Sequence, residues 1–196
     1  MARPAMLIAA LSFILALVTV HAGPQTGIYE EFPFCQCQKA QSAYSLAPTV
    51  SALGGSKFCF KLNVKAPAGA TGYCATKADL KKIESDCGLT TSALKMEFYA
   101  DDAQRRRITG VALMPAGSST FKFLSPTWGA VGEDTVKATP LKWSKEQAAG
   151  GKVCLELDDG TTLGSFCKGA TDSDSTCWAN IFDDTKNCCP LFASAL

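Results

Sequence analysis

The stretch Phe58-Cys59-Phe60-Lys61-Leu62-Asn63-Val64-Lys65 decides the fold class, because its apolar residues fall at every second position. In an extended strand this spacing puts Phe58, Phe60, Leu62 and Val64 on one face, which should be buried. We therefore predict a half-buried β-strand over residues 58–65.

The same period of two recurs along the chain, between turns rich in glycine, proline and aspartate. Asp158-Asp159-Gly160 lies between two such segments and predicts a hairpin that pairs 153–157 with 161–167. Short strands at this spacing predict a mainly β fold, a disulfide-rich antiparallel β-sandwich or a barrel-like sheet. Besides 58–65, the predicted strands are 94–98, 107–114, 120–124, 135–143, 152–157, 161–167 and 176–182.

One segment departs from the strand pattern. Apolar residues at helical spacing begin after Thr76 and end at Cys87, and a glycine follows. We predict one short helix over Lys77–Cys87 with Thr76 as its N-cap. A short strand around Lys82–Ser85 is the alternative interpretation.

The first residues predict export from the cell. The 16 residues of Ala5–Val20 are almost all apolar and follow a single arginine, and small residues precede Gly23. We predict a signal peptide over residues 1–22, cleaved after Ala22. The run is shorter than the roughly 20 residues that span a bilayer, so no membrane attachment is expected. Residues 23–196 are expected to form a single secreted domain.

The charge balance and the lack of histidine exclude several function classes. After removal of the predicted signal peptide, 18 Lys and Arg residues balance 18 Asp and Glu residues, which gives no basis for nucleic-acid binding. The only histidine, His21, lies in the signal peptide, so hydrolases that use a histidine base are excluded. A pair of carboxylates could still hydrolyse glycans. The carboxylates considered are expected to face solvent, so we predict no enzyme and no cofactor; they are Glu84, Glu97, Glu156, Asp158 and Asp159.

All ten cysteines follow the predicted cleavage site, and an even number in an oxidising compartment predicts five disulfides. Their pairing stays open, although pairs within Cys35–Cys37 or Cys188–Cys189 would close strained rings. The spacing does not suit zinc, and we predict no metal site. The cysteines are Cys35, Cys37, Cys59, Cys74, Cys87, Cys154, Cys167, Cys177, Cys188 and Cys189.

Two features are candidates for ligand binding. Trp128 lies in the loop-like stretch 125–129, where an indole ring could stack on a sugar. The run Arg105, Arg106 and Arg107 could bind an acidic polysaccharide, and its simpler interpretation is a solvated hairpin end that faces two aspartates. Trp178 alternates with apolar positions and is expected to be buried.

Several islands of sequence, taken in order, resemble the pherophorin domain of green-algal extracellular-matrix glycoproteins, and the resemblance covers residues 32–191. Two departures are visible: Tyr73-Cys74 stands where family members often have a double cysteine, and no hydroxyproline-rich rod is present. The matching islands are Phe32-Pro33-Phe34-Cys35-Gln36-Cys37, Tyr44-Ser45-Leu46, Cys59-Phe60, Asp79–Glu84, the segment 151–167 and Cys188-Cys189-Pro190.

The resemblance implies a secreted structural or interaction protein of the extracellular matrix or cell wall. Its expected partners are matrix glycoproteins or polysaccharide, and the sequence does not indicate an oligomeric state. A soluble lectin-like protein that binds polysaccharide is the alternative, followed by a carboxylate-dependent glycan hydrolase.

Overall fold

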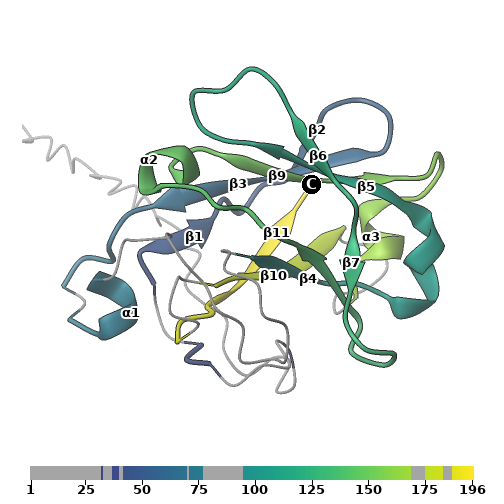
Figure 1. Cartoon of the computed structure of the whole chain (residues 1–196). Coiled ribbons are helices and arrows are strands. Elements are labelled where there is room, and N and C mark those ends of the chain that lie inside the picture. The colour runs from purple at the N-terminus through teal and green to yellow at the C-terminus, as the bar shows by residue number, and fades with distance from the viewer. Residues whose placement is uncertain are drawn as a thin grey trace, which may run out of the picture.

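The computed structural model describes Phe32 and residues 37–39, 42–69, 71–76, 95–168, 175–182 and 187–196. Within these residues the chain is mainly β and forms two antiparallel sheets, which confirms the predicted fold class; the sheets do not close into a barrel. Figure 1 shows the sheets as two layers, one above the other.

The first sheet contains six strands. Five follow the order β1-β3-β9-β5-β6, and β2 pairs with Phe58 and Cys59 of β3. Its centre is formed by the strands predicted from alternation, and Phe60 and Leu62 of β3 are fully buried as expected. The bounds are β1 Tyr44–Leu46, β2 Ser51–Ala52, β3 Lys57–Val64, β5 Ile108–Met114, β6 Lys122–Leu124 and β9 Lys152–Leu157.

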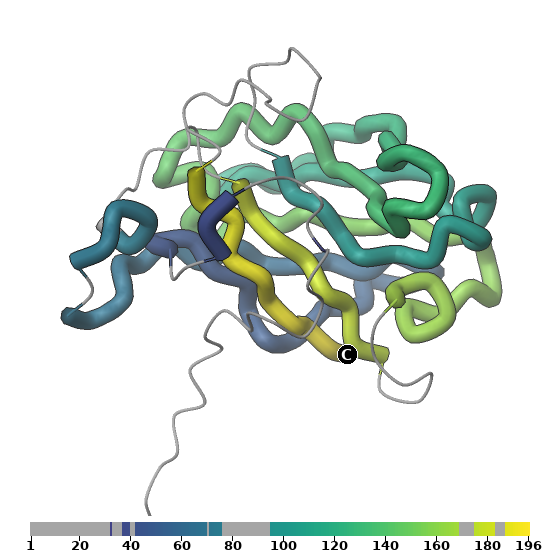
Figure 2. Tube along the Cα trace, turned by 90° about the horizontal axis from the view of Figure 1, so that it is seen from below, coloured from purple at the N-terminus to yellow at the C-terminus, as the bar shows by residue number. Residues whose placement is uncertain are grey.

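The second sheet contains five strands, in the order β11-β10-β4-β8-β7. Figure 2 shows β10 and β11 side by side in yellow along the lower face of the molecule. The bounds are β4 Met96–Tyr99, β7 Thr127–Trp128, β8 Thr135–Ala138, β10 Thr176–Ile181 and β11 Leu191–Ala195.

The main core lies between the two sheets. Alternate residues of β3, β5 and β9 pack against alternate residues of β4, β8 and β10 in one buried cluster. The rings of Phe60 and Phe98 meet edge to face with centroids 4.8 Å apart, so a phenylalanine from each sheet joins the layers. At one edge of the sandwich, Ser194 donates to the carbonyl oxygen of Ala47 at 2.8 Å and links β11 to the chain after β1.

The predicted hairpin between 153–157 and 161–167 is wrong. The turn itself is present, because the N–H of Thr161 donates to the carbonyl of Asp158, but the chain then enters α3 (Leu163–Phe166). Thr162 and Ser165 form a capping box that begins this helix. The pairing partners of β9 are instead β3 and β5, which lie far away in the sequence.

The remaining helices are short. The 3₁₀-helix η1 covers Asp102–Arg107, α1 covers Tyr73–Thr76 and α2 covers Lys145–Ala148. Thr76 thus belongs to α1 and is not the N-cap that we predicted for a helix over 77–87. The predicted helix 77–87 lies outside the described residues.

Four disulfides join the described cysteines. Cys59–Cys154 connects register partners on β3 and β9, and Cys167–Cys177 connects the end of α3 to β10.

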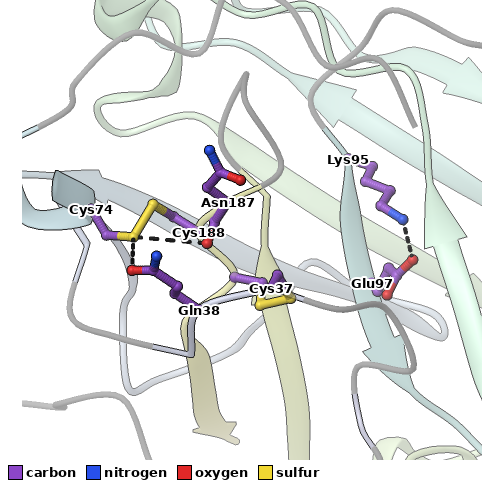
Figure 3. The surroundings of a disulfide bond; sticks show 8 residues. Cys37, Gln38, Cys74, Lys95, Glu97, Asn187 and Cys188 are labelled. Atoms are coloured by element: carbon purple, nitrogen blue, oxygen red, sulfur yellow. Dashed lines mark hydrogen bonds and ion pairs between the residues drawn. A yellow bond between two sulfur atoms is a disulfide. The ribbon is translucent and has the colours of Figure 1, made fainter. Parts of the chain in front are cut away.

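The adjacent residues Cys188 and Cys189 form separate bridges, to Cys74 of α1 and to Cys37 (Figure 3). These bridges join an early part of the chain to the segment before β11. Cys35 and Cys87 lie outside the described residues, so the fifth bridge stays a prediction.

Candidate functional site

The face of the first sheet that points away from the second carries two phenylalanines and an ion pair. Lys57 begins β3, and its Nζ lies 4.7 Å from the ring centroid of Phe121 and 5.4 Å from that of Phe123. The same nitrogen lies 2.7 Å from Oε1 of Glu156, the residue of β9 in register with Lys57. Phe123 is 61% exposed. We call these four residues the outer-face patch.

Small residues form the floor beside the outer-face patch. The Cys59–Cys154 disulfide and Ala112 form a small buried cluster on this face, and Phe121 packs against it. Gly110 is in register with Glu156, and a Cβ at this glycine would lie 3.0 Å from Oε2 of the glutamate. The absence of a side chain at 110 therefore leaves space for the Glu156 carboxylate above the sheet.

The predicted ligand residues Trp128 and Arg105 lie together in a second region. Trp128 is half-buried in the short strand β7, where we expected a loop. The Arg105 guanidinium carbon lies over the indole ring at 5.3 Å, and the Phe166 ring meets the indole edge-on at 6.0 Å. The side chain that we predicted as a sugar platform is therefore already packed against two groups of the protein.

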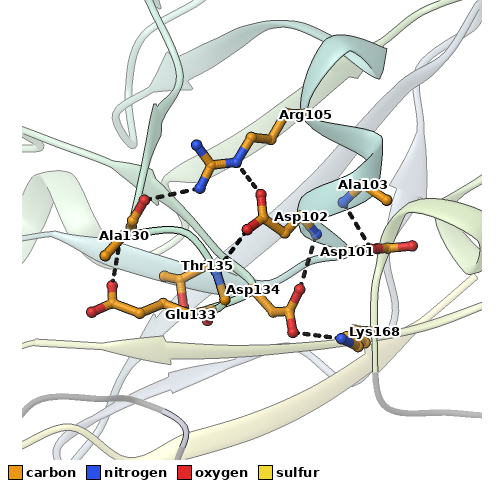
Figure 4. A network of polar contacts seen from close by, with 11 residues as sticks. Asp101, Asp102, Ala103, Arg105, Ala130, Glu133, Asp134, Thr135 and Lys168 are labelled. Carbon is orange, nitrogen blue, oxygen red and sulfur yellow. Dashed lines mark hydrogen bonds and ion pairs between the residues drawn. The ribbon is translucent and has the colours of Figure 1, made fainter.

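The arginine run ends η1, where we predicted a hairpin end. Arg105 donates through Nε to Asp102 and through a terminal nitrogen to the carbonyl oxygen of Gly129 at 3.0 Å (Figure 4). The other two arginines of the run, Arg106 and Arg107, are exposed. Ligand binding by these three arginines stays a prediction.

The Asp102 carboxylate accepts two hydrogen bonds in this network, from Arg105 and from Gly132. The backbone N–H of Gly132 donates to its Oδ2 at 2.9 Å, and this bond, with that from Arg105, lowers the pKa of Asp102. The backbone N–H of Asp102 in turn donates to Asp134 at 3.0 Å. The hydrogen bond from Lys168 to Asp134 raises the pKa of Lys168. Each of these polar groups has a hydrogen-bond partner within the network, which holds η1 against the turn before β8.

Among the carboxylates considered for catalysis, Glu97 differs most from expectation. We expected it to face solvent, but it is buried, with 2% of its side chain exposed. It forms ion pairs with Lys95 at 2.7 Å and with Lys137 at 3.9 Å. Burial is tolerated because the charge is paired with lysines on its own strand segment and on β8. Glu156 is partly exposed, and Glu84 lies outside the described residues.

The sequence interpretation missed Phe121 and Phe123 as candidate binding residues. Their i, i+2 spacing predicts that they share a face of one strand. This spacing could not tell which face, because Leu124, with the opposite orientation, is also apolar and packs against the main core.

Trp178 is buried as predicted, with 6% exposure, but it packs with Phe32 and Leu191 in a small cluster separate from the main core. Among the described residues, no group of three or more potential metal ligands is found. In the same part of the chain, no helix is long and apolar enough to cross a membrane.

Comparison with known proteins identifies the family. The sequence pattern of the pherophorin family matches residues 32–190. Perphorin-1 of Volvox carteri is 38% identical over 179 residues, a match that covers 85% of this chain and 32% of the relative. Perphorin-2 of the same organism is 37% identical, with 82% of this chain and 32% of the relative covered. The chain thus spans about a third of the length of either perphorin.

A third relative matches along nearly its whole length. The sexual inducer glycoprotein of Volvox carteri is 28% identical over 205 residues, a match that covers 93% of this chain and 92% of the relative. No solved structure gives a significant match. The family match covers most of the chain and agrees with the secreted, disulfide-bonded character expected from the cysteines. The chain belongs to the pherophorin family of secreted extracellular-matrix proteins.

Proposed function

We propose that this protein is a structural or interaction module of the extracellular matrix, and that its outer-face patch binds matrix polysaccharide. Its role is binding rather than catalysis. The observation that carries the proposal is the exposure of Phe123 beside Lys57 and Glu156, on a sheet face where a folded protein would normally place polar side chains.

The chemistry of the outer-face patch suits a sugar. The apolar face of a pyranose ring packs on an aromatic ring, as other apolar surfaces do. The Glu156 carboxylate can accept hydrogen bonds from hydroxyl groups, and the Lys57 ammonium can donate them or pair with an acidic substituent. The chain therefore presents an apolar platform and two charged groups on a rigid sheet, with β3 and β9 joined by a disulfide.

The Trp128 region is the alternative binding surface. One face of this indole is covered by Arg105, and the ring is half-buried, so less aromatic surface is available than at Phe123. The exposed Arg106 and Arg107 retain the capacity to attract an acidic chain.

A glycan array probed with the secreted protein tests the proposal, alongside the variants Phe123→Ala and Trp128→Ala. We expect the wild type to bind at least one matrix-type polysaccharide, Phe123→Ala to lose at least tenfold in affinity, and Trp128→Ala to bind like the wild type. If only Trp128→Ala loses glycan affinity, the binding site lies at η1 and β7 instead. If the wild type binds no glycan, the proposed polysaccharide role is wrong.

A further inference from the structure

A row of polar side chains crosses the second sheet on the face that points away from the first. Glu97 of β4 is in register with Lys137 of β8 on one side and with Asn180 of β10 on the other. Met96 and Phe98 point into the main core, so Glu97 and its register partners point the opposite way. Directly opposed residues of antiparallel strands have Cβ atoms about 5 Å apart, so Asn180 lies next to Glu97.

Asn180 is an unusual member of this row. Its exposure is 0%, and neither polar atom of its side-chain amide has a hydrogen-bond partner among the described residues. Its strand neighbour on the same face is the buried Trp178, and its register partner on β11 is the fully buried Leu191. An unsatisfied buried amide costs roughly 1–3 kcal/mol, so the chain retains an unfavourable group that packing alone does not explain.

Lys95 provides a nucleophile beside this amide. Its Nζ donates to Glu97 Oε1 at 2.7 Å (Figure 3) and lies 4.2 Å from the ring centroid of Phe182. The N–H of Phe182 donates to the Lys95 carbonyl, so Lys95 lies opposite Phe182 and diagonal to Asn180 across adjacent strands. Diagonal neighbours lie about 7–8 Å apart, and somewhat less at Cβ, a span that a lysine side chain can reach.

We propose that Lys95 and Asn180 form an intramolecular isopeptide bond, with Glu97 as the proton carrier. In the reaction the proton passes from Nζ to the Glu97 carboxylate, which already accepts a hydrogen bond from it at 2.7 Å. The neutral Nζ attacks Cγ of Asn180, the Nζ–Cγ bond forms and the Cγ–Nδ2 bond breaks. One of the two remaining Nζ protons passes to Nδ2, which leaves as ammonia. The ammonia takes up the proton held by Glu97, so ammonium is released and the glutamate ends as a carboxylate. No oxidant or other reactant is required.

Mass spectrometry of the mature secreted protein tests this bond. After full reduction of the disulfides, the intact mass should be lower than the sequence mass by one molecule of ammonia. A tryptic digest should contain a branched peptide that joins Lys95 to Asn180, and cleavage after Lys95 should be absent.

Three variants separate this bond from other losses of ammonia. Lys95→Arg removes the nucleophile and Glu97→Gln removes the proton carrier, so both should have the full sequence mass. Lys137→Arg changes the more distant lysine of the same row and should keep the cross-link. The proposal is overturned if the wild type has the full sequence mass, if the ammonia loss maps to a linear peptide, or if the branch joins other residues. The wild-type peptide map decides these outcomes even if a variant fails to fold.

Discussion

Replacement of both Cys59 and Cys154 by alanine removes the bridge within the first sheet, and the bridge topology gives the size of the effect. With this bridge open, the shortest covalent path between the two positions runs through two other bridges, Cys74–Cys188 and Cys167–Cys177. That path contains 15 residues from Cys59 to Cys74, 11 from Cys188 to Cys177 and 13 from Cys167 to Cys154, or about 39 in all. Closing a loop of this length restricts the unfolded chain by about 4 kcal/mol.

The Cys167–Cys177 bridge provides a matched control. It closes a loop of only 10 residues, so its removal should cost about 2.7 kcal/mol on the same relation. All four cysteines are buried, with exposures between 0% and 6%, so the packing cost of the alanines is similar in the two double variants. The difference between them therefore measures loop length.

Urea unfolding followed by tryptophan fluorescence, without reductant, measures both free energies of unfolding. We expect the Cys59/Cys154 variant to be less stable than the Cys167/Cys177 variant by about 1.2 kcal/mol, the difference between the two loop-closure values. With excess reductant the two variants should become equally stable. Equal stability without reductant, or the reverse order, would refute the loop-length reasoning.

Three further predictions concern the core, the polar network and the thiols. Phe98→Ala should lower the free energy of unfolding by about 3–5 kcal/mol, because it empties one side of the contact between the sheets, whereas Phe123→Ala should change it by less than about 0.5 kcal/mol; urea unfolding measures both. Because the pKa of Asp102 is lowered from its ordinary value of 3.8, the ionised carboxylate stabilises the fold at any pH above that value. This contribution is lost as the pH falls through the pKa of the folded state. Thermal unfolding scans should therefore show a weaker loss of stability in acid for Asp102→Asn. Labelling of the denatured, non-reduced mature protein should find no thiol, and two per chain would show that Cys35 and Cys87 are unpaired.

Local features of the fold could be predicted from the sequence. The alternation in residues 58–64 determines which side chains of β3 face the core, because side-chain direction in a strand depends only on position. The same reasoning located β5, β9 and β10 within a residue or two of their observed bounds. β11 was missed, since Leu-Phe-Ala-Ser-Ala contains no β-branched residue and only a weak alternation.

Pairing and burial could not be predicted in the same way. The choice of β3 and β5 as partners of β9 depends on contacts distant in sequence, whereas the turn at Asp158 suggested the nearest segment. Glu97 occupies the polar position of an alternating strand, and its burial depends on what packs on that face and on the lysines that neutralise it. The outer-face patch could likewise not be predicted from the sequence, because the exposure of Phe123 depends on how the sheet is assembled.

The positions of Cys37 and Cys189 have a mechanical consequence. A pulling force that enters the chain before Cys37 and leaves it after Cys189 passes through one covalent bridge, and the sandwich between these residues carries almost none of it. Among the described residues, only Phe32 and the seven residues after Cys189, most of them in β11, can be pulled away before the covalent path is loaded. In a matrix under tension, such a domain would transmit load without unfolding, and its surface would keep its shape while the network around it stretches.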